Sequence, residues 1–216
     1  MSGKRRKSPL KLTAQQVAEA LTTLEFRDQL LVFMDAGLGV RRGELAALRW
    51  KDCDFEQQVF DIQHSYYWRR GGHLVDTKSE ASAQPLPMHR AIKDGLLEWR
   101  SMSVYHEAKD FVFSSERLKG RKPLDLAAVL KKKIQPAFAK LGIVGVGWHT
   151  FRHTVGTMLA EMGEYQLTIR DYLRHSNLHV TNKYLQATSK SKRHAQDKLV
   201  EAILPTGLLP KTSLIQ

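Results

Sequence analysis

Four residues in the last third of the chain have side chains suited to chemistry on a phosphate group: His149, Arg152, His175 and Tyr184. On a helix, His149 and Arg152 fall one turn apart, beside an apolar stripe that begins at Phe151. A guanidinium matches the oxygens of a phosphate, and an imidazole can move protons near neutral pH. The pair His149-x-x-Arg152 is short and common, and alone it favours two unrelated surface residues.

A second polar pair lies in the first quarter of the chain. Arg41 and Glu44 are three positions apart, where a glycine-flanked turn enters a short helix. A carboxylate in this place can orient an arginine, and it can also complement the N-terminus of the helix. The pair therefore indicates either a structural ion pair or part of a site. The positions predicted to be buried just after it are Leu45, Leu48 and Trp50.

The elements that must position these residues are predicted to be mostly helices. A capping-box pattern from Thr13 to Gln16 starts the first, and apolar residues then recur at helical spacing. The segments with this pattern are 13–24, 24–35, 91–102, 126–141, 149–162 and 193–204. Gly37 and Gly39 are expected to end the helix at 24–35, and Pro136 is expected to bend or divide the helix at 126–141. Leu97 and Met162 are among the residues expected to face the core.

Alternating apolar and polar residues predict a small antiparallel β-sheet in the second quarter of the chain. The strand-like segments are 59–62, 65–68, 73–78 and 84–88, and a further short apolar strand is expected at 111–113. We therefore expect an α+β fold, mainly α with a small antiparallel β-sheet. Lys78 falls at a strand end, where a flexible ammonium group is either solvated or able to reach a groove.

Charge and composition favour a polyanionic partner. The chain has 216 residues and a formal net charge of +12, which favours nucleic acid first and an acidic membrane surface second. The membrane alternative is weaker, because Asp35 interrupts the best apolar run and no secretory signal precedes it. Cys53 is the single cysteine, which allows no internal disulfide. A cytoplasmic, nucleoid-associated location fits.

The order and spacing of the reactive residues resemble the catalytic domain of the tyrosine recombinase, or phage integrase, family. That set is Arg41, Glu44, Lys78, His149, Arg152, His175 and Tyr184. The nine positions from His175 to Tyr184 agree with the family, as does the acidic residue Asp52 that follows Trp50. Each motif alone is weak, but the ordered set covers residues 13–204. The resemblance implies a mainly helical domain that breaks and rejoins double-stranded DNA without metal or nucleotide cofactor.

The resemblance also implies a role for each member of the set. Tyr184 would attack the scissile phosphate, form a 3'-phosphotyrosine link and free a 5'-hydroxyl. Arg41 and Arg152 would hold the non-bridging oxygens as charge grows in the transition state. Lys78 would protonate the departing 5'-oxygen, and His149 would assist proton transfer at the tyrosine.

Two further residues have supporting roles in this scheme, and others are expected to contact DNA. His175 would donate to the phosphate, while Glu44 would position its neighbours. The basic residues expected to contact DNA are Lys4, Arg5, Arg6, Lys7, Arg42 and Arg174.

The chain departs from the family pattern in three places. The usual Leu-Gly-His appears here as Leu173-Arg174-His175, so the turn glycine is replaced. The strand at 84–88 lacks the arginine that usually precedes its apolar run. No segment before Thr13 is long enough for the family's N-terminal clamp domain, so we expect either a catalytic fragment or a reduced form.

The sequence divides into three predicted parts. Residues 1–12 form a basic arm or linker remnant, 13–190 the catalytic domain, and 191–216 a C-terminal helix and tail that docks on a neighbouring subunit. The function expected is that of a site-specific recombinase that forms a homo-tetramer on DNA during synapsis, with a monomer in isolation left open. The alternatives are a catalytically silent DNA-binding protein of the same fold and a type IB topoisomerase-like enzyme.

Overall fold

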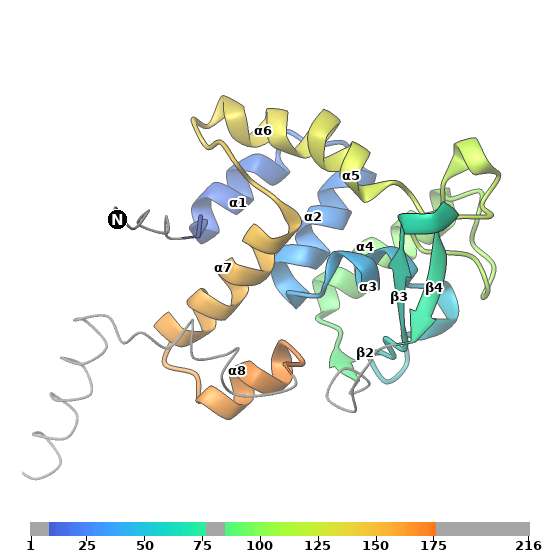
Figure 1. The fold of residues 1–216 in the computed structure, drawn as a ribbon. Helices are drawn as coiled ribbons and strands as arrows, with labels where there is room; N and C mark the ends of the chain where they lie inside the picture. Colours follow the sequence, from blue (N-terminus) through green and yellow to red (C-terminus); the bar gives the residue numbers. More distant parts are fainter. Residues whose placement is uncertain (1–8, 77–84, 176–216) are drawn as a thin grey trace, which may run out of the picture.

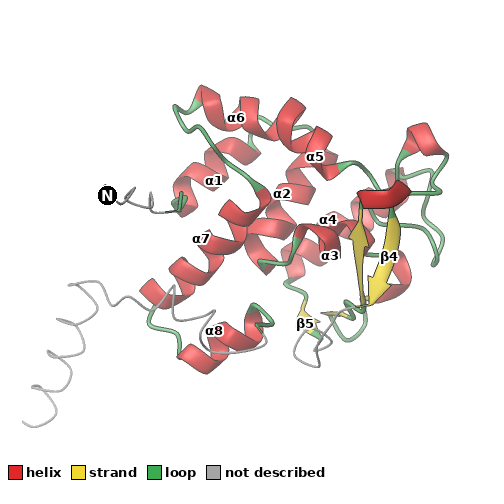
Figure 2. Cartoon of the chain, in the orientation of Figure 1, coloured by secondary structure: helices red, strands yellow, loops and turns green. Residues whose placement is uncertain are grey.

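The computed structural model describes residues 9–76 and 85–175, and most of its elements are helices (Figures 1 and 2). In chain order the helices are α1 (Ala14–Leu21), α2 (Phe26–Leu38), α3 (Arg42–Ala47), α4 (Arg90–Met102), α5 (Leu126–Val129), α6 (Gln135–Lys140), α7 (Trp148–Glu161) and α8 (Gln166–Tyr172). Shorter turns are η1 (Trp50–Asp52), η2 (Arg69–Gly71), η4 (Glu116–Leu118) and the π-helical η5 (Leu130–Ile134), which joins α5 to α6. The expected mainly α fold class is confirmed.

The strands form two small antiparallel sheets, so the prediction of a single sheet is wrong. One sheet has the order β1 (Cys53–Asp54), β2 (Val59–Phe60), β5 (Leu86–Pro87); the other is the hairpin of β3 (His64–Tyr67) and β4 (His73–Asp76). The strand near residue 86 pairs with β2 instead of β4, because the chain leaves strand geometry over 61–63 and starts a separate hairpin. In Figure 1 this hairpin stands at one side of the helices.

The apolar segment 111–113 is core and not a strand, which corrects a second prediction. Phe111 makes one isolated bridge, to Arg49, and no ladder follows it. The side chains of Phe111, Val112 and Phe113 are all buried. Alternating exposure, which a half-buried strand needs, is therefore missing here.

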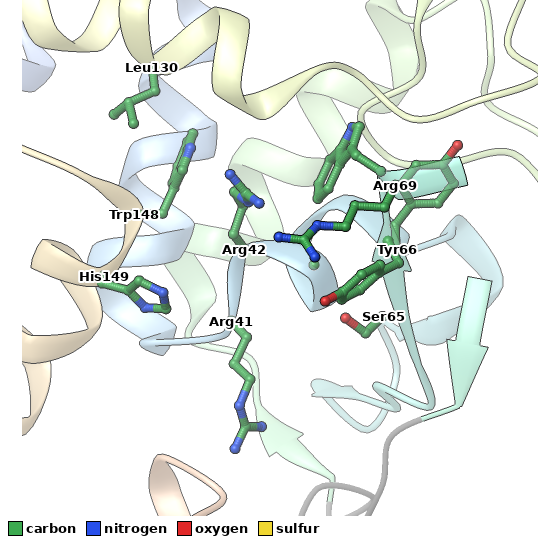
Figure 3. A pocket seen from close by; sticks show the side chains of 11 residues that line it. Arg41, Arg42, Ser65, Tyr66, Arg69, Leu130, Trp148 and His149 are labelled. Atoms are coloured by element: carbon green, nitrogen blue, oxygen red, sulfur yellow. The ribbon is translucent and has the colours of Figure 1, made fainter. Parts of the chain in front are cut away.

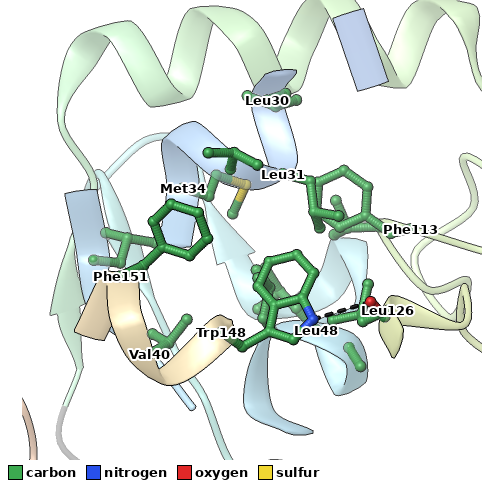
Figure 4. Close-up of a cluster of buried hydrophobic side chains, with 14 of the residues drawn as sticks. Leu30, Leu31, Met34, Val40, Leu48, Phe113, Leu126, Trp148 and Phe151 are labelled. Atoms are coloured by element: carbon green, nitrogen blue, oxygen red, sulfur yellow. Dashed lines mark hydrogen bonds between the residues drawn. The ribbon is translucent and has the colours of Figure 1, made fainter. Parts of the chain in front are cut away.

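Helix α2 lies at the centre of the core and contacts α1, α4, α7 and η5. Its buried Leu31 and Met34 lie near Phe151 of α7, and Trp148 packs on the same cluster (Figure 4). The Trp148 indole N–H donates to the Leu126 carbonyl at 2.9 Å, the bond drawn in Figure 4. This bond and the aromatic packing fix the first turn of α7, which carries His149.

Several helix ends differ from the sequence expectation. Gly37 lies inside α2, and Gly39 alone ends that helix, with the left-handed φ of 60° that glycine adopts readily. Pro136 occupies the first turn of α6, and the predicted 126–141 helix is a continuous helical run in which α5, the π-helical η5 and α6 follow one another. Leu97 and Met162 are 42% and 69% exposed, so the prediction that they face the core is wrong. Within the described ranges no helix combines the length and apolar character needed to cross a bilayer.

Candidate active site

An open pocket of about 430 Å³ brings residues from three distant parts of the chain together (Figure 3). Arg41 and Arg42 come from the start of α3, and His149 comes from the first turn of α7. The wall opposite α7 is β3 and the turn after it, with Tyr66, Trp68 and Arg69. The Arg42 guanidinium carbon lies 4.8 Å from the centroid of the Trp68 ring, a cation–π distance. The pocket is therefore basic and partly aromatic, which suits a phosphate-bearing ligand.

Arg41 is held by Glu44, as the three-residue spacing allows. Its Nη1 donates to Glu44 Oε1 at 2.7 Å, and its main-chain N–H donates to Oε2 at 2.9 Å. The Arg41 side chain is 40% exposed, whereas that of Glu44 is 2% exposed. A buried carboxylate thus anchors a partly exposed guanidinium, which in Figure 3 points away from Arg42 and Arg69 and donates from Nη2 to the Arg174 carbonyl. The structural ion pair is therefore present and Arg41 also lines the pocket, while a catalytic role for the pair stays a prediction.

Glu44 also pairs with a second guanidinium, that of Arg174. Arg174 Nη2 lies 2.5 Å from Glu44 Oε2, and both side chains are 2% exposed. Burial raises the pKa of Glu44, but the charges of Arg174 and Arg41, with the hydrogen bonds from Arg41, outweigh it and lower the pKa overall. Glu44 is therefore a carboxylate shared by two arginines.

Arg152 connects the two segments that flank the pocket. Its Nη1 donates to the Gly39 carbonyl and its Nη2 to the Leu173 carbonyl, and the residue is 8% exposed. These bonds tie the loop before Arg41 to the end of α8. In this structure Arg152 thus braces the site, and its contact with a phosphate stays a prediction.

His175 is placed by a helix-end motif. The Arg174 N–H donates to the Asp171 carbonyl and the His175 N–H to the Arg170 carbonyl, both at 2.9 Å, which is the Schellman pattern. Arg174 has the left-handed φ of 52° that this motif requires, at the position where the family usually has glycine. His175 is 4% exposed and so lies beneath the surface.

The structure argues against the predicted DNA contact of Arg174. The residue is 1% exposed, because its guanidinium turns inward to Glu44. Arg42, by contrast, lines the open pocket, as a DNA-contacting residue must. Lys78, Tyr184 and the basic residues Lys4, Arg5, Arg6 and Lys7 lie outside the described residues.

Sequence reasoning missed Asp35 as a buried carboxyl group within range of the charges of Arg152 and Glu44. Asp35 lies on α2, is fully buried, and neither carboxylate oxygen has a hydrogen-bond partner among the described residues. Burial raises its pKa well above the ordinary value, the positive charge of Arg152 lowers it by less, and the charge of Glu44 adds to the rise. The available signal was a charged residue inside an apolar helical run.

The aromatic wall of the pocket was also missed. Tyr66, Trp68 and Arg69 were predicted only as strand and turn residues. The signal was the concentration of aromatic and basic residues at 66–70, beside a turn. Its orientation toward α7 depends on tertiary packing of β3 against α3.

Comparison with known proteins gives consistent relatives. The model of the Phage integrase family matches residues 11–191. A XerC-like tyrosine recombinase of Caldanaerobacter subterraneus subsp. tengcongensis is 29% identical over 197 residues, which are 80% of this chain and 49% of the relative. The ICEBs1 integrase of Bacillus subtilis is 25% identical over 171 residues, covering 74% of this chain and 45% of that protein. The chain thus spans about half the length of these relatives.

Solved structures share the fold. The Tn1549 transposon integrase, in complex with transposon right end DNA, superposes with a TM-score of 0.78 at 21% identity, over 92% of this chain and 69% of that one. The XerA recombinase gives a TM-score of 0.67 at 21% identity, over 92% of this chain and 66% of that one. Since the family model spans most of the sequence and the fold agrees, the chain belongs to the phage integrase family.

Proposed function

We propose that this chain is the catalytic domain of a site-specific DNA recombinase, an integrase that cleaves and rejoins DNA through a covalent link to Tyr184. The observation that carries the proposal is the pocket shared by Arg41 and His149, from α3 and α7, with Arg152 tying Gly39, just before Arg41, to Leu173. A silent DNA-binding domain has no chemical need for this set. The proposal includes the domain boundary between the catalytic domain, residues 13–190, and the C-terminal segment, residues 191–216.

The proposed cleavage step is a transfer of one phosphoryl linkage. The Tyr184 oxygen bonds to the phosphorus as the bond to the 5'-oxygen breaks, so a DNA 3'-phosphotyrosine and a 5'-hydroxyl result. The tyrosine proton passes to His149, and Lys78 supplies the proton of the departing 5'-oxygen. The guanidinium groups of Arg41 and Arg152 stabilise the charge on the non-bridging oxygens. The reverse reaction with a new 5'-hydroxyl joins the strands.

The proposed partner is double-stranded DNA. The net charge of +12 and the basic pocket favour a phosphate backbone, and one structural relative was solved with DNA. A homo-tetramer at synapsis and a cytoplasmic, nucleoid-associated location belong to the same proposal. The match covers 49% of the XerC-like relative, and the rest of a longer protein could contribute to DNA affinity. The test below therefore includes any longer parent protein.

The test is trapping of the covalent intermediate on nicked duplexes. The duplexes form a library with randomised sequence around the nick. Cleavage beside the nick releases a short 5'-hydroxyl fragment, so the strand cannot be rejoined. Protein covalently linked to DNA therefore accumulates and is seen on a denaturing gel. We expect the linked band with the native chain or its parent, no band with Tyr184→Phe, and an unchanged band with Tyr165→Phe, which alters an exposed tyrosine. Linkage that survives Tyr184→Phe would remove Tyr184 as the nucleophile, and DNA binding without linkage would favour the silent alternative.

A second substrate tests Lys78 as the acid. Replacing the bridging 5'-oxygen with sulfur gives a leaving group that needs no proton. We expect Lys78→Ala to lose cleavage of the oxygen substrate and to recover it with the sulfur substrate. Equal loss with both substrates would assign Lys78 a role in binding and not in proton transfer.

A further inference from the structure

Arg174 makes contacts that a turn residue does not need. Its left-handed φ of 52° is a conformation that favours glycine, and a long charged side chain there carries a conformational cost. Its guanidinium is also buried, which is unfavourable unless a partner compensates the charge. The Glu44 carboxylate, 2.5 Å away and 2% exposed, is that partner. An arginine at this position is therefore stable because of Glu44.

The same carboxylate connects Arg174 to the reactive side of the pocket. Glu44 holds Arg41 through Oε1 and Arg174 through Oε2, so one group fixes both guanidinium groups. Arg41 Nη2 in turn donates to the Arg174 main-chain carbonyl at 3.3 Å. The three residues close a ring of contacts between the start of α3 and the end of α8. The next residue along the chain is His175.

We propose that Arg174 is a positioning residue that acts through Glu44: it sets the orientation of Arg41 in the pocket and holds the turn that carries His175 against α3. The inference rests on the proposed recombinase function for its effect on catalysis, but the ion pair itself is independent of that function. It also replaces the DNA contact expected from sequence with an internal role. Glycine in its place would keep the turn and lose the connection.

The positioning role predicts an effect on rate without an effect on DNA affinity. A buried guanidinium makes no phosphate contact, so its removal leaves the dissociation constant and its salt dependence unchanged. Misplacement of Arg41 by a fraction of an ångström to one ångström lowers the rate of bond cleavage, by up to about 100-fold. A residue that bound DNA would instead show weaker binding and a salt slope reduced by about one.

The experiment compares Arg174→Met, Arg174→Gly and Arg174→Lys in the full chain or its parent. Carbon-13 NMR of the Glu44 carboxyl group follows its titration, and Glu98→Gln helps assign the spectrum by removing another glutamate signal. Trapping on the nicked duplex at saturating DNA gives the cleavage rate, and fluorescence anisotropy at several salt concentrations gives affinity. Arg174→Gly relieves the backbone conformation, so it separates loss of the ion pair from misfolding.

We expect Arg174→Met and Arg174→Gly to raise the titration midpoint of Glu44 and to slow cleavage with affinity unchanged, and Arg174→Lys to recover part of the rate. Normal cleavage in both uncharged variants would overturn the proposal, as would weaker binding with a smaller salt slope. An unmoved Glu44 titration would show that the pair is absent in solution. If the native protein cleaves no DNA while Glu44 still responds to Arg174→Met, the proposed function fails and the ion pair stands.

Discussion

Helices α2 and α3 each carry a buried carboxyl group, and the surroundings shift the pKa values of these two groups in opposite directions. Glu44, at the start of α3, is paired with Arg41 and Arg174, and its pKa is lowered. Asp35, on α2, has no hydrogen-bond partner among the described residues, and its pKa is raised. Burial is similar in both, so the difference comes from guanidinium groups within contact distance. A buried acid thus becomes an anchor only where its partners touch it.

The largest expected effect is from Glu44→Gln, which breaks the ion pairs of Glu44. It leaves the buried Arg174 without a counter-charge, and breaking a buried ion pair typically costs about 3 to 5 kcal/mol of unfolding free energy. Urea unfolding followed by circular dichroism measures the loss. The control is Glu44→Gln combined with Arg174→Met, which should be less destabilised because no charge stays buried alone. Equal stability of native chain and Glu44→Gln would mean that the ion pair contributes nothing net.

The next effect is from Gly39→Ala, in the loop between α2 and α3. Gly39 has a φ of 60°, and an added Cβ would lie 2.8 Å from Leu173 Cδ2 and 3.2 Å from a Val155 methyl carbon. We expect a loss of about 1 to 3 kcal/mol from overpacking and strain, measured by urea unfolding. Gly142→Ala is the matched control, because its φ is 73° and no atom lies within 4 Å of the added Cβ. If both variants lose equally, only backbone strain matters at Gly39.

An effect of comparable size, which depends on pH, is expected from Asp35→Asn. Because the folded-state pKa of Asp35 lies above its ordinary value of 3.8, the folded chain keeps the proton longer than the unfolded chain. The stability contributed by Asp35 is therefore complete below pH 3.8 and is lost as the pH rises through the raised pKa. Asn cannot titrate. The unfolding free energy of the Asp35→Asn variant relative to that of the native chain should therefore rise with pH, by about 1 to 3 kcal/mol.

Unfolding free energies of native chain and Asp35→Asn, measured from about pH 4 to pH 8, check this prediction. The difference between the two proteins cancels the titration of other groups. A difference that is flat over this range would mean that Asp35 is ionised throughout and that Arg152 compensates it fully. The contrast between the two buried carboxylates would then disappear.

The smallest effect is expected from Glu161→Gln, at an ion pair on the surface. Lys11 Nζ lies 2.7 Å from Glu161 Oε1, the same distance as in the Arg41–Glu44 pair, but the side chains are 57% and 45% exposed. Exposed pairs contribute less than about 1 kcal/mol. Thermal unfolding at low and high salt should give nearly equal midpoints for Glu161→Gln and the native chain. A loss as large as that of Glu44→Gln would show that distance, and not burial, sets the strength of these pairs.

The sequence by itself determined the fold class, the capping box at Thr13 and the short helix at Arg42, and it suggested the candidate set Arg41, Glu44, His149 and Arg152, whose roles stay predictions. These features depend on local spacing: helical period, end signals and residue type act over a few positions. The partner of the strand near residue 86 and the lack of a ladder at 111–113 could not be read in this way. Both depend on segments elsewhere in the chain, and spacing carries no information about which segment will be adjacent.

Only the tertiary structure decided how the charged residues are used. Arg174 read as a surface cation, yet the end of α8 turns it onto Glu44, which is 130 positions away in sequence. Arg152 read as a phosphate ligand, yet here its guanidinium ties Gly39 to Leu173. In the sequence, Asp35 is only an interruption of an apolar run, yet in the structure it is buried close enough to Arg152 for that charge to lower its pKa. Charge–charge interaction depends on distance and burial in space, and neither quantity is local in sequence.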